Sequence, residues 1–167
     1  MDVHDKETRS RNMRAIKSRD TKPEVKLRKA LHRNGLRYRI CPKALIGRPD
    51  LYFPKYKAAV FVHGCFWHAH NCDFFQLPKS RISFWQNKLN LNVRRDIRVI
   101  KALQSQKIRV LVIWECAIMG KNKLAEAMIV RLVQEWLQAE LFFGVIDSLG
   151  LKNGAISDPN LDTYFKI

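Results

Sequence analysis

The sequence predicts an α/β fold in which helices cover both faces of a mixed central sheet. The order of patterns is the first observation: one helical segment, three strand-like segments, then helix, strand and helix. Two apolar runs, at 58–62 and 110–114, are continuous rather than alternating, as in strands buried on both faces. Hydrophobic residues make up 47% of the 167 residues, enough for one core and too many for a disordered chain.

The N-terminal region reads as a basic arm followed by a capped helix. Residues 4–20 are polar and basic and can bury little surface, so 1–20 are expected to form a mobile or weakly helical arm. Thr21 and Glu24 then form a capping box, with a proline in the first helical turn. A helix is predicted from there to the stop signal at Asn34 and the glycine after it.

Three strand-like segments follow this helix. Residues 36–40 alternate apolar and basic side chains, the period of a half-buried strand. A Gly-Arg-Pro breaker at 47–49 precedes a strand over 50–53. The turn at 54–57 then leads into the buried strand at 58–62.

The second half of the chain alternates helices and strands after a long loop. About twenty residues rich in His, Cys and aromatics have no clear period, which indicates an ordered loop. Helical spacing covers 84–104 and 124–141, and a continuous apolar strand covers 110–114. We therefore expect one domain over 21–141 and a C-terminal tail, of open order, over 142–167.

The charge balance indicates a polyanionic partner. Thirty-one Lys and Arg against fifteen Asp and Glu give a net charge of +16, which is costly unless a polyanion compensates it. Nucleic acid is the leading candidate, ahead of a membrane surface or an acidic protein. No apolar run approaches the roughly 20 residues that span a bilayer. The start of the sequence lacks the apolar stretch of a signal peptide, so a cytoplasmic protein is expected.

One loop carries a pattern typical of a metal site. Two Cys and two His lie within 65–72, and structural zinc prefers a closed tetrahedron of thiolate and imidazole ligands. The best four ligands are Cys65, His70, Cys72 and, beyond the next buried strand, Cys116. The alternative is a set of scattered core cysteines and exposed histidines. Cys41 lies in the basic edge region and is expected to be an unligated thiol. Four cysteines in a chain of this length do not indicate a disulfide framework.

The aromatic pair in this loop, Phe66 and Trp67, allows two interpretations. A metal-tethered loop stays near the surface, where both rings cannot easily turn inward. They can then form a rigid wedge that stacks on or between bases. Alternatively, they form a small satellite core around the metal.

Four polar residues suit phosphate chemistry, although each has an ordinary structural explanation. Asp50 can be a turn residue after the Gly-Arg-Pro breaker, and the capping box accounts for Glu24. His68 can face solvent. Asp96 can pair with a neighbouring arginine or face water. Taken singly, none of them establishes an active site.

Several motifs stand together in order along the chain. They are Asp20-Thr21 with Glu24, Gly47-Arg48-Pro49-Asp50, the block from Phe61 to His68, His70, Cys72, Phe84-Trp85, Arg95-Asp96 and Trp114-Glu115-Cys116. With these motifs the chain closely resembles the very-short-patch repair endonucleases, the Vsr family, from about residue 4 to about residue 140. The His-Gly-Cys-Phe-Trp-His block with its downstream Trp-Glu-Cys is the most specific part of the likeness.

The resemblance implies a restriction-endonuclease-like fold, an enzyme and a substrate. The enzyme would nick one strand of double-stranded DNA 5′ to the thymine of a T:G mismatch, which arises when 5-methylcytosine deaminates. The resemblance also implies catalytic Mg²⁺ and structural Zn²⁺. It implies a functional link to a DNA cytosine methyltransferase and to mismatch and short-patch repair proteins, with no membrane partner. A monomer at the bacterial nucleoid is expected, since a single-strand nick needs one active site.

The same resemblance assigns catalytic roles by motif position. Asp50 would be the carboxylate ligand of Mg²⁺, and the backbone carbonyl of Val62 a second ligand. His68 would be the general base for the attacking water, and Asp96 would hold its imidazole. The remaining active-site residues would be His63 and Glu24.

The DNA contacts and the zinc site are assigned in the same way. The zinc ligands coincide with the four residues chosen above from spacing. Phe66, Trp67 and Trp85 would enter the helix beside the mismatch. The arm would grip DNA from the minor-groove side through Met13 and Ile16, with Arg14 and Lys17 beside them.

Two departures from related patterns narrow the mechanism. Restriction-type nucleases usually carry an E-x-K pattern on the strand after the aspartate, whereas Phe61-Val62-His63 stands here. This favours a histidine-based variant. Val62 stands where some family members have threonine, so only its backbone can serve the metal. The alternative function is a non-catalytic, zinc-stabilised DNA-binding module; an RNA or membrane binder lacks any supporting motif.

Overall fold

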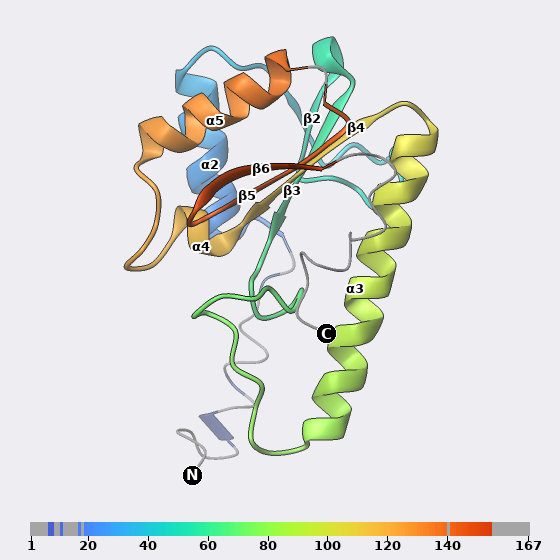
Figure 1. Ribbon diagram of the computed structural model, residues 1–167, viewed down its shortest axis with the longest axis vertical. Coiled ribbons are helices and arrows are strands. Elements are labelled where there is room, and N and C mark those ends of the chain that lie inside the picture. The colour runs from blue at the N-terminus through green and yellow to red at the C-terminus, as the bar shows by residue number, and fades with distance from the viewer. Residues whose placement is uncertain (1–6, 9–10, 12–16, 18, 140, 155–167) are drawn as a thin grey trace.

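The structure of the chain is a computed structural model that describes residues 7–8, 11, 17, 19–139 and 141–154 (Figure 1). In chain order its elements are α2 (Lys22–Arg33), β1 (Arg39–Ile40), β2 (Leu51–Phe53), the 3₁₀ turn η1 (Pro54–Tyr56), β3 (Ala58–His63), α3 (Ile82–Ser105), β4 (Arg109–Trp114), α4 (Glu115–Ile118), α5 (Glu126–Gln138), β5 (Phe143–Asp147) and β6 (Gly150–Gly154). None of the helices in the described part of the chain has the length and apolar character needed to cross a membrane.

The strands form one six-stranded sheet in the order β1-β2-β3-β4-β5-β6. β2 pairs antiparallel with both β1 and β3, the strands β3, β4 and β5 run parallel to one another, and β6 returns antiparallel to β5. Parallel neighbours need a crossover, which α3 supplies between β3 and β4, and α4 with α5 between β4 and β5. The predicted class, a mixed sheet with helices, is confirmed.

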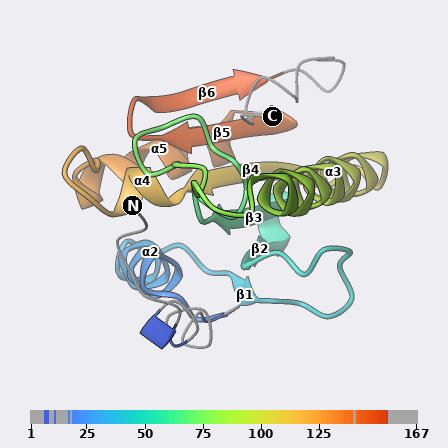
Figure 2. The ribbon, with the colours of Figure 1, turned by 90° about the horizontal axis from the view of Figure 1, so that it is seen from below.

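Alternating side chains of the central strands build a core on each face of the sheet. Val60 and Leu111 pack with residues of α2, α4 and α5. Phe61 and Val112 pack with residues of α3 on the opposite face. Figure 2 shows α3 on one side of the sheet and α2, α4 and α5 on the other. Two-sided burial explains why β3 and β4 read as continuous apolar runs rather than alternating ones.

Two predicted elements differ in extent from the observed ones. The strand predicted over 36–40 is reduced to the two exposed residues of β1. Leu36 and Tyr38 pack against the core without pairing, so the alternation there reflects an extended segment rather than a ladder. The helix predicted over 124–141 is α5 alone, because Ala125 has an extended backbone and serves as its N-cap.

The region predicted as a tail, 142–167, contains two strands of the same sheet. β5 is buried throughout, and β6 pairs with it along its length. The sequence pattern did not indicate β5 because Gly144 interrupts its apolar run. A Cβ at this position would lie 2.4 Å from Trp136 Nε1, so only glycine fits beneath the indole. The sheet therefore continues to Gly154, past the expected boundary at 142. Residues 155–167 lie outside the described part of the chain.

Candidate active site

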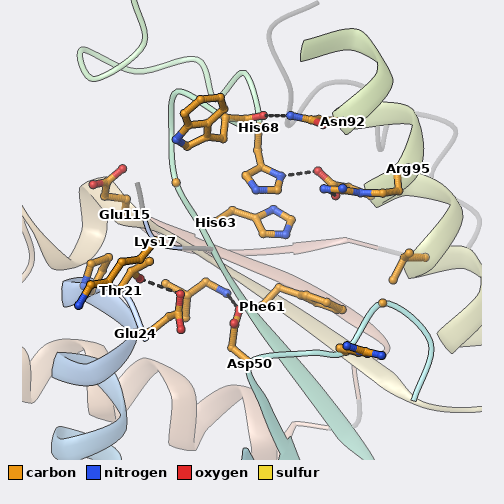
Figure 3. A pocket seen from close by; sticks show the side chains of 18 of the residues that line it. Lys17, Thr21, Glu24, Asp50, Phe61, His63, His68, Asn92, Arg95 and Glu115 are labelled. Carbon is orange, nitrogen blue, oxygen red and sulfur yellow. Dashed lines mark hydrogen bonds and ion pairs between the residues drawn. The ribbon is translucent and has the colours of Figure 1, made fainter. Parts of the chain in front are cut away.

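A cleft of about 1050 Å³ opens where the carboxyl end of β3 lies between the start of α2 and the middle of α3 (Figure 3). Its walls come from segments far apart in sequence. The residues predicted to act in catalysis that line it are Glu24, Asp50, Val62, His63, His68 and Asp96. The fold thus brings the whole predicted catalytic set into one cavity.

Asp50, directly before β2, is a half-buried carboxylate at the floor of this cleft. Its Oδ2 accepts a hydrogen bond from the backbone N–H of Val62 at 2.7 Å. Within the described residues it forms no ion pair. Burial, with a smaller contribution from the charge of Glu24, raises its pKa to about 7, although the Val62 hydrogen bond and Arg28 oppose the shift. A half-buried carboxylate that forms no ion pair with the described residues fits a site for a hard cation such as Mg²⁺.

This pKa predicts how stability depends on pH in buffer without Mg²⁺. In the folded protein Asp50 keeps its proton up to about pH 7, whereas in the unfolded chain it ionises near 3.8. The contribution of the Asp50 carboxyl group to the free energy of unfolding is therefore fully present below pH 3.8. It is lost as the pH rises through 7. Asp50→Asn removes that loss, so we expect the variant to unfold with a free energy about 2–4 kcal/mol higher than wild type at pH 8, and nearly equal at pH 4.

Urea unfolding at the two pH values measures this difference. The exposed Asp73, changed to asparagine, is the matched control and should show no such pH-dependent gain. Equal stability of wild type and Asp50→Asn at pH 8 would show that the Asp50 carboxylate carries no burial penalty.

Glu24 is buried and oriented by the start of α2. Its Oε1 accepts a hydrogen bond from Thr21 Oγ1 at 2.7 Å, and its Oε2 accepts one from the backbone N–H of Asp20 at 2.9 Å. Arg28, one turn later, lies 2.6 Å from Asp20 and 3.5 Å from Glu24. Thr21 makes no side-chain cap of its own, and Glu24 accepts the backbone N–H of Asp20 instead of that of Thr21, so the predicted capping box is replaced by these contacts. The contacts hold the carboxylate beside Asp50.

A histidine pair forms the opposite wall of the cleft. His68 Nδ1 lies 2.5 Å from Asp96 Oδ2, and Asp96 also lies 3.6 Å from Arg95. The His63 ring stacks on His68 with centroids 3.9 Å apart and planes 6° from parallel. Burial, helped by the nearby charges of His68 and Arg95, lowers the pKa of His63 well below its usual range. His63 is therefore neutral, and the Nδ1 contact to Asp96 leaves the Nε2 of His68 for proton transfer.

The aromatic residues of the loop and of α3 form one surface cluster. The ring centroids of Phe66 lie 5.1 Å from Trp67 and 5.4 Å from Trp85, and those of Trp67 and Trp85 lie 6.1 Å apart. All three side chains are half-buried. Trp67 also lines the cleft, and Asn92 donates a hydrogen bond to its carbonyl at 2.9 Å. The cluster therefore lies beside the cleft and is fastened to α3.

The four predicted zinc ligands lie together behind the same loop. The candidate ligand atoms of Cys65, His70, Cys72 and Cys116 all lie within 4.8 Å of one another. His70 Nδ1 is 3.5 Å from the Cys65 sulfur and 3.6 Å from the Cys116 sulfur. Metal–ligand bonds of about 2.0–2.3 Å in a tetrahedron require separations of this size, so the residues fit a closed structural zinc site.

The thiols of this cluster already differ in proton affinity. A hydrogen bond between the sulfurs of Cys65 and Cys116 lowers the pKa of Cys116 and raises the pKa of Cys65. The contact with the His70 side chain and a hydrogen bond from the backbone N–H of Ser148 also lower the pKa of Cys116. One member of the set is thus prepared as a thiolate, the form that binds metal.

Several residues that received no role from the sequence also line the cleft. Lys88, Asn92, Arg95 and Val99 of α3 line the cleft at helical spacing, and Glu115 enters it from the start of α4. The i, i+4 and i+7 spacing of the α3 residues is the signal that could have identified this face. On the arm, Lys17 is exposed and lines the cleft. The predicted contacts of Met13, Arg14 and Ile16 lie outside the described residues and stay predictions.

Comparison with known proteins gives consistent matches. The family model described as DNA mismatch endonuclease Vsr matches residues 1–74. DNA mismatch endonuclease Vsr of Escherichia coli K12 is 45% identical over 150 residues, covering 90% of this chain and 96% of that protein. The type II nicking enzyme V.NmeAIP of Neisseria meningitidis is 42% identical over 135 residues, covering 80% and 95%. V.XorIIP of Xanthomonas oryzae is 45% identical over 104 residues, covering 62% and 76%.

Proposed function

The chain belongs to the Vsr family of DNA mismatch endonucleases, and we propose that it nicks one DNA strand 5′ to the thymine of T:G mismatches. The family makes it a DNA-nicking endonuclease of repair. The meeting of Asp50 with the His68–Asp96 pair in one cleft carries the proposal about its chemistry. A fold related to restriction endonucleases is part of the same proposal, supported by the mixed sheet and by the hydrogen bond from Val62 on β3 to Asp50.

Phosphodiester hydrolysis needs a neutralised phosphate and a deprotonated water. Mg²⁺, held by the Asp50 carboxylate and the Val62 carbonyl, would supply the first. His68 takes the proton of the attacking water at Nε2, because Asp96 keeps the other ring nitrogen protonated. The neutral His63 stacked on this ring holds its orientation without repelling the positive charge that develops on His68.

Asp96→Asn is expected to lower the single-turnover nicking rate by about 10²–10⁴-fold. The asparagine side chain fills the same space, but it cannot stabilise the charged imidazole of His68. DNA affinity in a gel-shift titration should change less than about threefold, because the loss affects the transition state. Asp73→Asn serves as the exposed control and should cut at the wild-type rate. A fully active Asp96→Asn enzyme would exclude the predicted His68–Asp96 pairing in catalysis.

Mismatch selectivity is proposed to come from the aromatic cluster. Unstacking a wobble pair costs less than unstacking a Watson–Crick pair, which favours insertion at the mismatch by a few kcal/mol. Trp67 belongs to the cluster and lines the cleft. Insertion of Phe66, Trp67 and Trp85 would therefore leave the neighbouring linkage at Asp50 and His68.

The arm and the basic surface are proposed to supply sequence-independent affinity. Lys17, Lys88 and Arg95 line the cleft and can contact phosphates. Residues 1–20 would reach the minor groove through Met13 and Ile16, with Arg14 beside them. Because its substrate is DNA, the enzyme is proposed to act at the nucleoid, and it would act as a monomer because a single-strand nick needs one active site. It would be linked in function to a DNA cytosine methyltransferase and to repair proteins that process the nick.

A nicking assay on end-labelled duplexes tests this function. We expect one cut, 5′ to the thymine of a T:G duplex, at least about 10²-fold faster than on the matched T:A duplex. Cutting should require Mg²⁺. Equal rates on matched and mismatched DNA, or cutting in EDTA, would contradict the proposal. A duplex that is bound but never cut in Mg²⁺, Mn²⁺ or Co²⁺ would instead identify a non-catalytic DNA-binding module.

A further inference from the structure

Asp147, the last residue of β5, is a buried carboxylate with a 5% exposed surface. Its Oδ1 accepts a hydrogen bond from the backbone N–H of Leu149 at 2.8 Å, which stabilises the turn to β6. Its Oδ2 lies 2.5 Å from Lys152 Nζ and 4.0 Å from His70 Nε2. The turn accounts for one oxygen only. The other oxygen faces a residue of the metal cluster.

The His70 ring presents its two nitrogens to different groups. Nδ1 lies 3.5 Å from the Cys65 sulfur and 3.6 Å from the Cys116 sulfur. Nε2 lies on the side of Asp147. Trp114 stacks on the ring face with centroids 4.1 Å apart and planes 9° from parallel, so the ring cannot tilt freely. His70 is therefore oriented to bind metal through Nδ1.

We propose that Asp147 is a positioning residue of the metal centre, accepting the Nε2 proton of His70 and so leaving Nδ1 free to bind the metal. A neutral imidazole carries its proton on one nitrogen only, and a carboxylate beside Nε2 selects the tautomer that exposes Nδ1. The 4.0 Å separation exceeds a hydrogen bond by about 1 Å, a gap that one bridging water closes. This inference rests on the proposal that Cys65, His70, Cys72 and Cys116 bind a structural zinc ion.

The turn after β5 touches a second ligand as well. The backbone N–H of Ser148 donates a hydrogen bond to the Cys116 sulfur. Zinc with three thiolates and one neutral imidazole carries a net charge of about −1, to which Asp147 adds another. Lys152 on β6 balances the added charge. The β5–β6 hairpin is thus the outer support of the metal centre.

Zinc release from the full-length protein tests the proposal, with Asp147→Asn as the variant and Lys152→Met as the matched control. Asparagine still accepts the Leu149 N–H, but it turns an N–H donor toward Nε2 and so disfavours the required tautomer. We expect Asp147→Asn to release zinc to a colorimetric chelator about 10–100-fold faster than wild type. Lys152→Met removes the ion pair, keeps the carboxylate, and should stay within about threefold of wild type.

Long-range ¹H–¹⁵N NMR on histidine-labelled protein adds a readout of the tautomer itself. Zinc-loaded wild type should show the His70 proton on Nε2, and Asp147→Asn should weaken or reverse that preference. If both proteins hold zinc equally well, or Lys152→Met loses zinc as fast as Asp147→Asn, the role of Asp147 is refuted and the zinc site stands. A wild-type protein that binds no zinc would refute both.

Discussion

Replacing Asp50 by asparagine is expected to slow nicking of T:G duplexes at least about 10³-fold. The amide keeps the size of the side chain and still accepts the Val62 N–H, whose bond to Asp50 is 2.7 Å long. It has no charge with which to hold Mg²⁺, and losing about 4 kcal/mol of transition-state stabilisation corresponds to this factor. Single-turnover rates with enzyme in excess, measured across a Mg²⁺ titration, give the effect.

Two controls separate this loss from misfolding. The variant should bind T:G duplex within about threefold of wild type, since phosphate contacts supply most of the affinity. It should also be more stable than wild type at pH 8 without Mg²⁺, as argued above from the raised pKa of Asp50. An Asp50→Asn enzyme that retains more than about a tenth of the wild-type rate would show that another residue holds the cation.

Changing Cys116 to serine is expected to cause general loss of folded protein. Structural zinc contributes about 10–16 kcal/mol in small metal-binding domains, comparable with the about 5–15 kcal/mol that stabilises a whole protein. Cys116 belongs to α4, its sulfur lies 3.6 Å from His70 Nδ1 in the loop after β3, and it is 3% exposed. Circular dichroism, the soluble yield and the zinc content per chain measure the outcome.

Cys41 supplies the matched control for this prediction. It is a half-buried cysteine outside the metal cluster, so Cys41→Ser should fold and keep zinc like wild type. An intact wild-type fold that contains no zinc would contradict the structural role of the metal. So would a Cys116→Ser protein as stable as the Cys41 variant.

The central strands were predictable because a strand that is buried on both faces has a continuous run of apolar residues. The runs at 58–62 and 110–114 match β3 and β4 to within a residue at each end. α3 and α2 follow from helical spacing and from the Asn34 stop. β5 was not predictable, because Gly144 interrupts its apolar run. The glycine is required by close contact with the Trp136 indole. Such a contact exists only in three dimensions.

Some residues of the candidate site were predictable from the sequence, and others were not. Three members of the metal cluster lie within one loop, so spacing alone could identify them. Asp50 and His68 follow only from the resemblance, since each also had an ordinary explanation, and the fold places both in the cleft. Neither residue spacing nor the family resemblance identified Lys88 and Asp147. Their positions depend on how α3 and the β5–β6 hairpin dock against the loop.

The most direct test is a crystal structure of the Asp96→Asn variant bound to a T:G duplex with Mg²⁺. Phe66, Trp67 and Trp85 should be inserted beside the mismatch, with the Asp50 carboxylate and a phosphate 5′ to the thymine sharing one cation. An aromatic cluster that points away from the duplex, with Asp50 remote from every phosphate, would contradict the proposed mechanism of mismatch cleavage.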